Sequence, residues 1–178
     1  MRKKSLLFFF LVLLFSSFTF SQVKIGLVNA NRAVLGTDEG KAEMKKINEW
    51  AKAQDEKIRN MQQKLQAKKD QFAKQQNILS DSKKEALLKE IDDLSTRIKR
   101  AAEDAKKNYQ MKLSEFGNKM DKKITPLFKK YAKEHGYTVI LYLDPRTIAY
   151  FDPSVDITDE IIKLYNKTYP YGGAKTNK

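Results

Sequence analysis

The chain has 178 residues, no cysteine, one histidine and a formal net charge of +13. Without cysteine it can form no disulfide, and a single histidine with no thiolate argues against a zinc centre. No Gly-rich phosphate loop and no converging set of acid, base and nucleophile is found, so we expect no enzyme, no cofactor and no catalytic, cofactor-binding or metal-binding residue.

The first 21 residues are typical of a secretory signal peptide. Three basic residues precede an unbroken apolar run at 6–15, and the small residues Thr19 and Ser21 favour cleavage before Gln22. The alternative is an uncleaved membrane anchor, but the apolar run is short of the about 20 residues that a spanning helix needs. We therefore predict an exported, periplasmic protein.

The positive charge of the mature chain is concentrated in its middle. Removing the three basic residues of the signal from the total of 35 leaves 32 Lys and Arg against 22 Asp and Glu, a net charge of +10. Residues 41–134 hold 25 of these basic and 15 of these acidic residues, which accounts for the whole excess. Such a segment attracts nucleic acid, anionic membranes or acidic protein segments.

A strand is predicted over 23–29, followed by a helical or irregular connector at 30–36. Thr37 and Asp38 are suited to cap a long helix that runs to about Asn77. The return helix is expected to begin after a tip at 77–81, with a capping box formed by Ser82 and Glu85.

A heptad pattern runs along both predicted helices. Steps of three and four keep a narrow apolar seam on one side of each helix, so the two form an antiparallel hairpin in which facing positions sum to about 159. Polar seam positions predict a flexible hairpin whose base is better fixed than its tip. The first run is Ile47, Ala51, Gln54, Ile58, Met61, Leu65, Lys68 and Phe72; the second is Leu87, Ile91, Leu94, Ile98, Ala101, Ala105, Tyr109, Leu113, Phe116, Met120, Ile124 and Leu127.

Past the seam, Pro126 is expected to kink the return helix or to start a new one capped by Thr125. Gly136 is expected to end the helix in a left-handed conformation. Strands at 137–143 and 147–151 should form a β-hairpin through a turn at 144–146. A last helix, 159 to about 165, follows with Asp156 or Thr158 as cap, and the tail from Tyr169 is expected to be disordered.

These elements predict an α+β chain with two parts. Residues 37–125 form the helical hairpin, residues 22–36 and 126–168 form a small β-rich body, and 169–178 form the tail. The body is too small for a comfortable core and leaves sheet edges open, so it should associate with other chains.

Several segments together resemble the Skp/OmpH family of periplasmic chaperones. They are residues 24–29, 124–127 leading to 134–137, and 143–151, with 156–158 closing the body. Each segment alone is weakly specific, but their order around a charged helical hairpin is characteristic.

The resemblance implies a homotrimer whose strands combine into a central β-barrel, with three hairpins projecting around a cavity. It implies a holdase that needs no nucleotide and keeps unfolded outer-membrane β-barrel proteins soluble in the periplasm. An anionic lipid or lipopolysaccharide surface is left open as a second partner. The candidate body and trimer-interface residues are Ile25, Leu27, Tyr137, Val139, Leu141, Ile148 and Tyr150. The candidate client contacts, expected to be exposed, are Phe72, Ile78, Leu79, Met111 and Phe116.

Two other functions stay open on sequence alone. A structural coiled-coil spacer of the cell envelope would need a rigid hairpin, which the polar seam positions argue against. A nucleic-acid binder would use the basic helices on phosphates, but an exported protein meets little nucleic acid.

Overall fold

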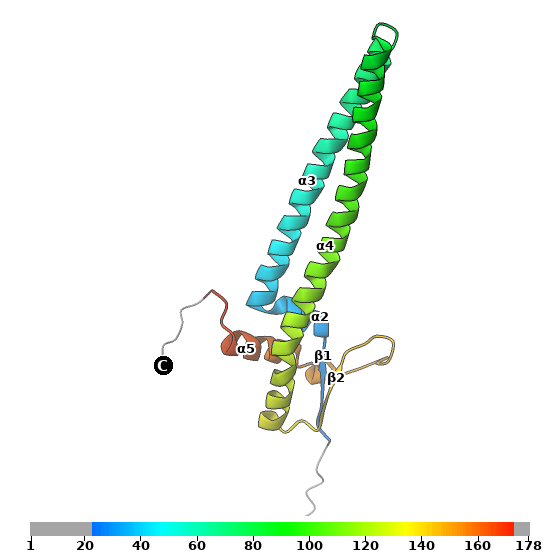
Figure 1. Cartoon of the computed structure of the whole chain (residues 1–178). Coiled ribbons are helices and arrows are strands. Elements are labelled where there is room, and N and C mark those ends of the chain that lie inside the picture. The colour runs from blue at the N-terminus through cyan, green and yellow to red at the C-terminus, as the bar shows by residue number, and fades with distance from the viewer. Residues whose placement is uncertain (1–22, 173–178) are drawn as a thin grey trace, which may run out of the picture.

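The computed structural model describes residues 23–172, so the predicted signal peptide and its cleavage point lie outside the described residues. Two long helices project from a small body at one end (Figure 1). The elements in chain order are β1 (Ile25–Val28), α2 (Ala30–Gly36), α3 (Asp38–Gln75), α4 (Asp81–His135), β2 (Val139–Tyr142), the 3₁₀ turn η1 (Pro153–Val155) and α5 (Thr158–Thr168).

The predicted hairpin is confirmed. Helices α3 and α4 run side by side as an antiparallel pair (Figure 1), with 38 and 55 residues and lengths of about 57 and 82 Å. The seam is thin, because most heptad positions are half-buried. Apart from the positions of α4 at 116–127, where the helix meets the body, only Ile47 and Leu87 are buried. An ion pair between Lys68 and Glu90 fits the predicted register.

Most of the predicted helix ends are correct. Thr37 caps α3, since its Oγ1 accepts a hydrogen bond from the Gly40 N–H at 2.9 Å. Gly136 ends α4 with a φ of 68°. The capping box at Ser82 is wrong: α4 begins at Asp81, two residues before the start that a Ser82 cap implies, and Ser80 occupies the N-cap position without a side-chain hydrogen bond.

Helix α4 runs through Pro126 without ending, so of the two alternatives the new helix capped by Thr125 is wrong and the kink stays a prediction. The Thr125 Oγ1 instead donates to the Asp121 carboxylate one turn back, at 2.9 Å. Both neighbouring apolar residues, Ile124 and Leu127, are 4% exposed. Their burial offsets the about 3 kcal/mol that a proline costs inside a helix.

The sheet has two strands and differs from the predicted β-hairpin. Strand β1 pairs with β2 in parallel, with Ile25 opposite Val139, so the whole helical hairpin is inserted between the two strands. Residues 147–151 form no strand in this chain. The carboxylate of Asp144 accepts from the Arg146 N–H at 2.9 Å and binds its guanidinium, and the resulting turn directs the chain away from β2.

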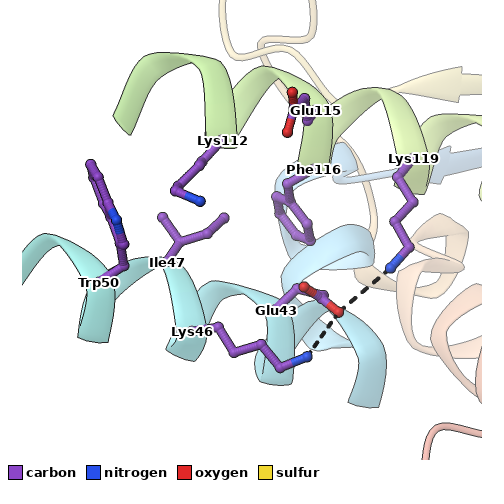
Figure 2. A pocket seen from close by; sticks show the side chains of 8 residues that line it. All are labelled: Glu43, Lys46, Ile47, Trp50, Lys112, Glu115, Phe116 and Lys119. Atoms are coloured by element: carbon purple, nitrogen blue, oxygen red, sulfur yellow. Dashed lines mark hydrogen bonds and ion pairs between the residues drawn. The ribbon is translucent and has the colours of Figure 1, made fainter. Parts of the chain in front are cut away.

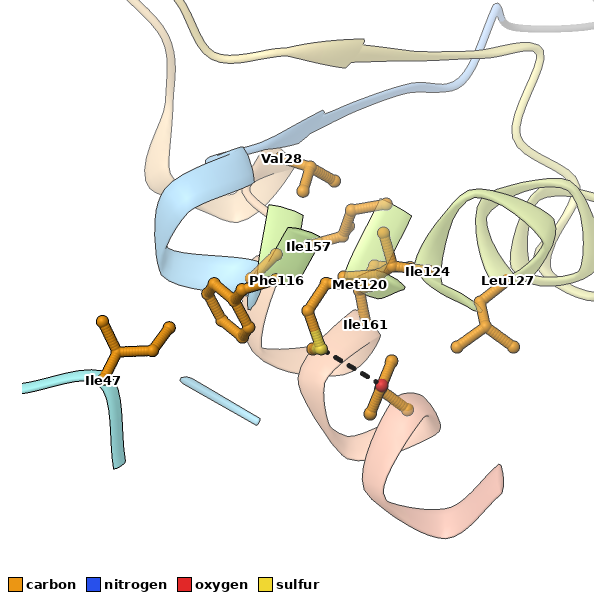
Figure 3. Packing of buried hydrophobic residues seen from close by; sticks show 10 residues of the cluster. Val28, Ile47, Phe116, Met120, Ile124, Leu127, Ile157 and Ile161 are labelled. Carbon is orange, nitrogen blue, oxygen red and sulfur yellow. Dashed lines mark hydrogen bonds between the residues drawn. The ribbon is translucent and has the colours of Figure 1, made fainter. Parts of the chain in front are cut away.

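The core lies where the hairpin meets the body (Figure 3). Side chains of β1, α4 and α5 meet there, and the fully buried ones include Val28, Met120, Ile161 and Tyr165. Helix α5 is longer than predicted, and its N-cap position is Ile157, so the predicted cap at Asp156 or Thr158 is wrong. The Asp156 carboxylate, one residue before the cap, accepts from the Thr158 N–H at 2.9 Å. The expected disorder of the tail does not hold for Tyr169, which packs on Tyr165 with ring centroids 5.1 Å apart.

Gly40 gives a direct test of the tight connection between α2 and α3. A Cβ at this position would lie 2.0 Å from the carbonyl oxygen of Val34, which is backbone and cannot move aside easily. We expect Gly40→Ala to lower the free energy of unfolding by about 1–3 kcal/mol. Gly117→Ala is the matched control: its Cβ would meet nothing within 4 Å, and a helical alanine should add about 0.5–1 kcal/mol. Denaturant titrations at one protein concentration measure both changes; equal effects would contradict the close approach.

Candidate functional site

The candidate client contacts fall into two groups by exposure. Ile78 at the tip is 82% exposed and Met111 on α4 is 46% exposed, whereas Phe72 and Leu79 are half-buried. The expected exposure of Phe116 is wrong, because its ring is 8% exposed and belongs to the core cluster with Ile47. The heptad pattern places Phe116 on the α3-facing side of α4 but does not show that the core extends so far up the hairpin.

The candidate body residues also differ in exposure. Leu27 is buried inside this chain, and Tyr137, Val139 and Ile148 are half-buried. Ile25, Leu141 and Tyr150 are 43%, 45% and 84% exposed. One edge of β1 is occupied, since the Ile157 N–H donates to the Leu27 carbonyl at 2.9 Å. No strand of the described residues pairs with the other edge of β2.

An apolar hollow of about 360 Å³, here called the body groove, lies beside that sheet. The rings of Phe128 and Tyr142 meet edge to face at 5.8 Å in its wall, and Leu35 is 42% exposed. Its lining comes from α2, α3, α4 and β2: Ala30, Asn31, Ala33, Val34, Leu35, Met44, Phe116, Gly117, Asp121, Ile124, Phe128 and Tyr142. Much of the apolar surface of the body therefore has no cover within one chain.

The hairpin is anchored to the body through the buried carboxylate of Glu39. Lys123 lies 2.7 Å from it, Lys119 lies 2.9 Å from it, and the Tyr165 hydroxyl donates to it at 2.7 Å. Burial by itself raises the pKa of Glu39, but the hydrogen bonds from Lys123, Lys119 and Tyr165 outweigh it and hold the pKa at about 2. Burial and the adjacent carboxylate both raise the pKa of Tyr165. Side chains of α4 and α5 thus contact one carboxylate of α3, which joins the three helices at the base of the hairpin.

Above this anchor the two arms enclose a hollow of about 300 Å³, the base cleft (Figure 2). Glu43, Lys46, Ile47 and Trp50 line it from α3, and Lys112, Glu115, Phe116 and Lys119 line it from α4. Ile47 and Phe116 form an apolar floor, and the ammonium group of Lys112 lies 5.2 Å from the centre of the Trp50 ring. Trp50 is only half-buried.

A second hollow of about 460 Å³ lies on the other side of Trp50 and includes Ile58, Ala105 and Tyr109 in its lining. The sequence offers a reason for both hollows. The seam of α4 contains three successive spacings of four residues, at Ala101, Ala105, Tyr109 and Leu113. The facing seam of α3 continues to alternate spacings of four and three. Such a phase shift turns one seam away from the other and loosens the contact between the arms.

Within residues 23–172 no group of three or more His, Asp and Glu side chains is arranged to hold a metal ion. No helix of this part of the chain combines the length and apolarity needed to cross a bilayer.

Residues 24–165 match the family of outer membrane proteins described as OmpH-like. The chain belongs to the OmpH-like family. It is 27% identical over 144 residues to the chaperone protein Skp of Yersinia enterocolitica, which covers 79% of this chain and 84% of that protein. The fold matches a crystal structure from Caulobacter crescentus CB15, described as an outer membrane chaperone (OmpH-like), with a TM-score of 0.67. That match covers 87% of this chain and 90% of the other at 12% identity, so it shows the fold alone.

The OmpH-like assignment agrees with the helical hairpin on a small sheet seen here. Both relatives are described as chaperones, a class of protein distinct from enzymes. The candidate site is a set of three surfaces: the basic hairpin, the base cleft and the uncovered body groove.

Proposed function

We propose that this protein is a periplasmic holdase that binds unfolded outer-membrane β-barrel proteins and prevents their aggregation without nucleotide. The observation that carries the proposal is the long basic hairpin projecting from a small body in a chain of the OmpH-like family. Its relatives are described as chaperones, and neither the spacer nor the nucleic-acid interpretation gains support from them.

The hairpin is suited to hold a client through many weak contacts. Basic side chains of 41–134 attract acidic segments at long range, and exposed apolar groups such as Ile78 and Met111 add short-range contacts. Several weak contacts on one surface retain a chain while each of them can open separately. Phe72 and Leu79 stay proposed contacts, and Phe116 is withdrawn because it is buried.

We further propose that the working form is a homotrimer with a shared β-barrel. The free edge of β2 and the exposed Leu141 and Tyr142 next to the body groove support this proposal, since each leaves apolar or hydrogen-bonding surface open to water. Ile25 and Tyr150 stay proposed interface residues. An anionic lipid or lipopolysaccharide surface stays a proposal for a second partner.

The test is to dilute a urea-denatured outer-membrane β-barrel protein into the mature chain, residues 22–178, without nucleotide. Size exclusion with light scattering should then give a discrete complex of three chains and one client. A bare oligomer beside an aggregated client would contradict the proposal. Raising the salt concentration to about 0.5 M should weaken the complex because the screening length falls to a few ångströms. An affinity that ignores salt would exclude the electrostatic part.

A further inference from the structure

The base cleft combines an apolar floor, an aromatic wall and a surplus of positive charge. Ile47 and Phe116 form the floor, and Trp50 stands at one end (Figure 2). Three lysines and only two glutamates line the same hollow. The volume of about 300 Å³ is at the lower end of the range of about 300–1,000 Å³ for ligand sites, enough for one aromatic ring.

The three lysines of the base cleft differ in whether a carboxylate forms an ion pair with them. Lys46 pairs with Glu43 at 3.3 Å, and Lys119 pairs with Glu39 at 2.9 Å. Within residues 23–172, no carboxylate lies at ion-pair distance from Lys112, whose ammonium group faces the Trp50 ring. Lys112 therefore offers a cation beside an aromatic surface.

We propose that the base cleft binds an aromatic side chain of an unfolded polypeptide whose neighbouring residues are acidic. The ring enters between Trp50 and the apolar floor, and a flanking carboxylate pairs with Lys112. A ring contributes apolar area and prefers edge or offset contacts with other rings. The ion pair then selects acidic neighbours, as the positive field of the hairpin also does. The inference rests on the proposed function, because it names the part of a client that this site takes.

A polypeptide fits the site better than a small free acid because the hollow does not end at Trp50. The second hollow, with Ile58 and Tyr109 in its lining, continues along the hairpin on the other side of this ring. An extended chain whose aromatic group fills the base cleft can lay its next residues along that surface. A free aromatic acid would gain nothing from it.

Trp50 is the single tryptophan of the chain and lines both hollows, so its fluorescence reports on the base cleft and on the second hollow beside it. The probes are short acetylated and amidated peptides with Asp-Phe-Asp, Asp-Ala-Asp or Lys-Phe-Lys at their centre, together with phenylacetate. Titration of the full mature chain should give a saturable change in Trp50 emission with the Asp-Phe-Asp peptide. The other three probes should bind at least about fivefold more weakly. Equal affinity for the alanine or lysine peptide, or for phenylacetate, would overturn the proposal.

Lys112→Gln tests the ion pair and keeps the reporter. Lys112 is half-buried and belongs to no ion pair within residues 23–172. We therefore expect the variant to fold with unchanged helicity and to bind the Asp-Phe-Asp peptide about fivefold more weakly. Lys99→Gln removes an exposed charge of the same helix outside the cleft and should leave the affinity unchanged. Equal affinities of the two variants would overturn the role of Lys112.

Parallel aggregation assays separate this inference from the proposed function. If the wild-type chain keeps a denatured outer-membrane protein soluble but no peptide changes the Trp50 emission, the cleft proposal fails and the holdase stands. If the Asp-Phe-Asp peptide binds as expected while the denatured protein aggregates, the holdase fails and the cleft remains a peptide site.

Discussion

Glu39→Gln should lower the free energy of unfolding at pH 7 by about 3 kcal/mol. The folded carboxylate has a pKa of about 2 against an ordinary value of 4.5, and each unit of this difference corresponds to about 1.4 kcal/mol. The neutral amide of the variant supplies no negative charge to compensate Lys119 and Lys123, whose ammonium groups lie 2.9 and 2.7 Å from the carboxylate in the wild type. Thermal or denaturant unfolding at one protein concentration measures the loss.

The pH dependence gives the same prediction an independent readout. Because the folded pKa is lowered, the stabilisation by Glu39 is complete above about pH 4.5 and disappears as the pH falls through 2. The difference between the wild type and Glu39→Gln should therefore shrink by about 2 kcal/mol between pH 7 and pH 3. Glu49→Gln is the control, since this exposed carboxylate has only a 3.8 Å contact with Lys45. A constant difference across this pH range would exclude the charge of Glu39 as the cause.

Shortening the hairpin should weaken the hold on an unfolded client by about tenfold without unfolding the body. Deleting 58–71 and 88–101 removes two facing heptads from each arm, so the 159 register is kept and the hairpin loses about 21 Å. The Glu39 anchor and the tip with Ile78 both remain. Client protection per mole of protein, measured by light scattering, should fall. The oligomeric state should not change, and the helicity should fall only by the contribution of the deleted helical residues.

The deletion also removes charge, which needs its own control. The two deleted segments hold eight Lys and Arg and four Asp and Glu, a net charge of +4. Replacing the exposed Arg59, Lys64, Lys99 and Arg100 by Gln in the full-length chain removes the same charge and keeps the reach. If this variant loses as much client protection as the shortened one, the loss comes from the missing charge and not from the shorter hairpin.

The helical hairpin could be predicted because its information is local and repeated. The alternation of three and four, the cap at Thr37 and the left-handed Gly136 each depend on a few neighbouring residues, and all three are present in the structure. The capping box at Ser82 failed by a small margin, since a helix start within a polar stretch can move by a residue or two. The new helix at Pro126 failed for another reason: its neighbours Ile124 and Leu127 are buried in a cluster with residues that lie far away in the chain, such as Val28 and Ile161.

The body and the base cleft were harder to predict because they depend on distant pairings. A pattern of apolar residues predicts strands but not partners, and β2 pairs with β1 across more than 100 residues instead of with 147–151. The burial of Phe116 and the ion cluster around Glu39 likewise join segments that only the folded chain brings together. One signal was present for the cleft: the three steps of four after Ala101 show that the two seams cannot stay in phase.

Because α4 is unbroken, the hairpin can rotate as one rigid arm about the Glu39 ion cluster at its base. A rotation of about 5° there moves the end of an arm about 57 Å long by about 5 Å. The position of the tip relative to the body therefore depends on the contacts at the base, where the ions around Glu39 and the core residues of α4 meet, more than on the long seam. In the trimer proposed above, the same rotation changes the distance between neighbouring tips and with it the space for a client.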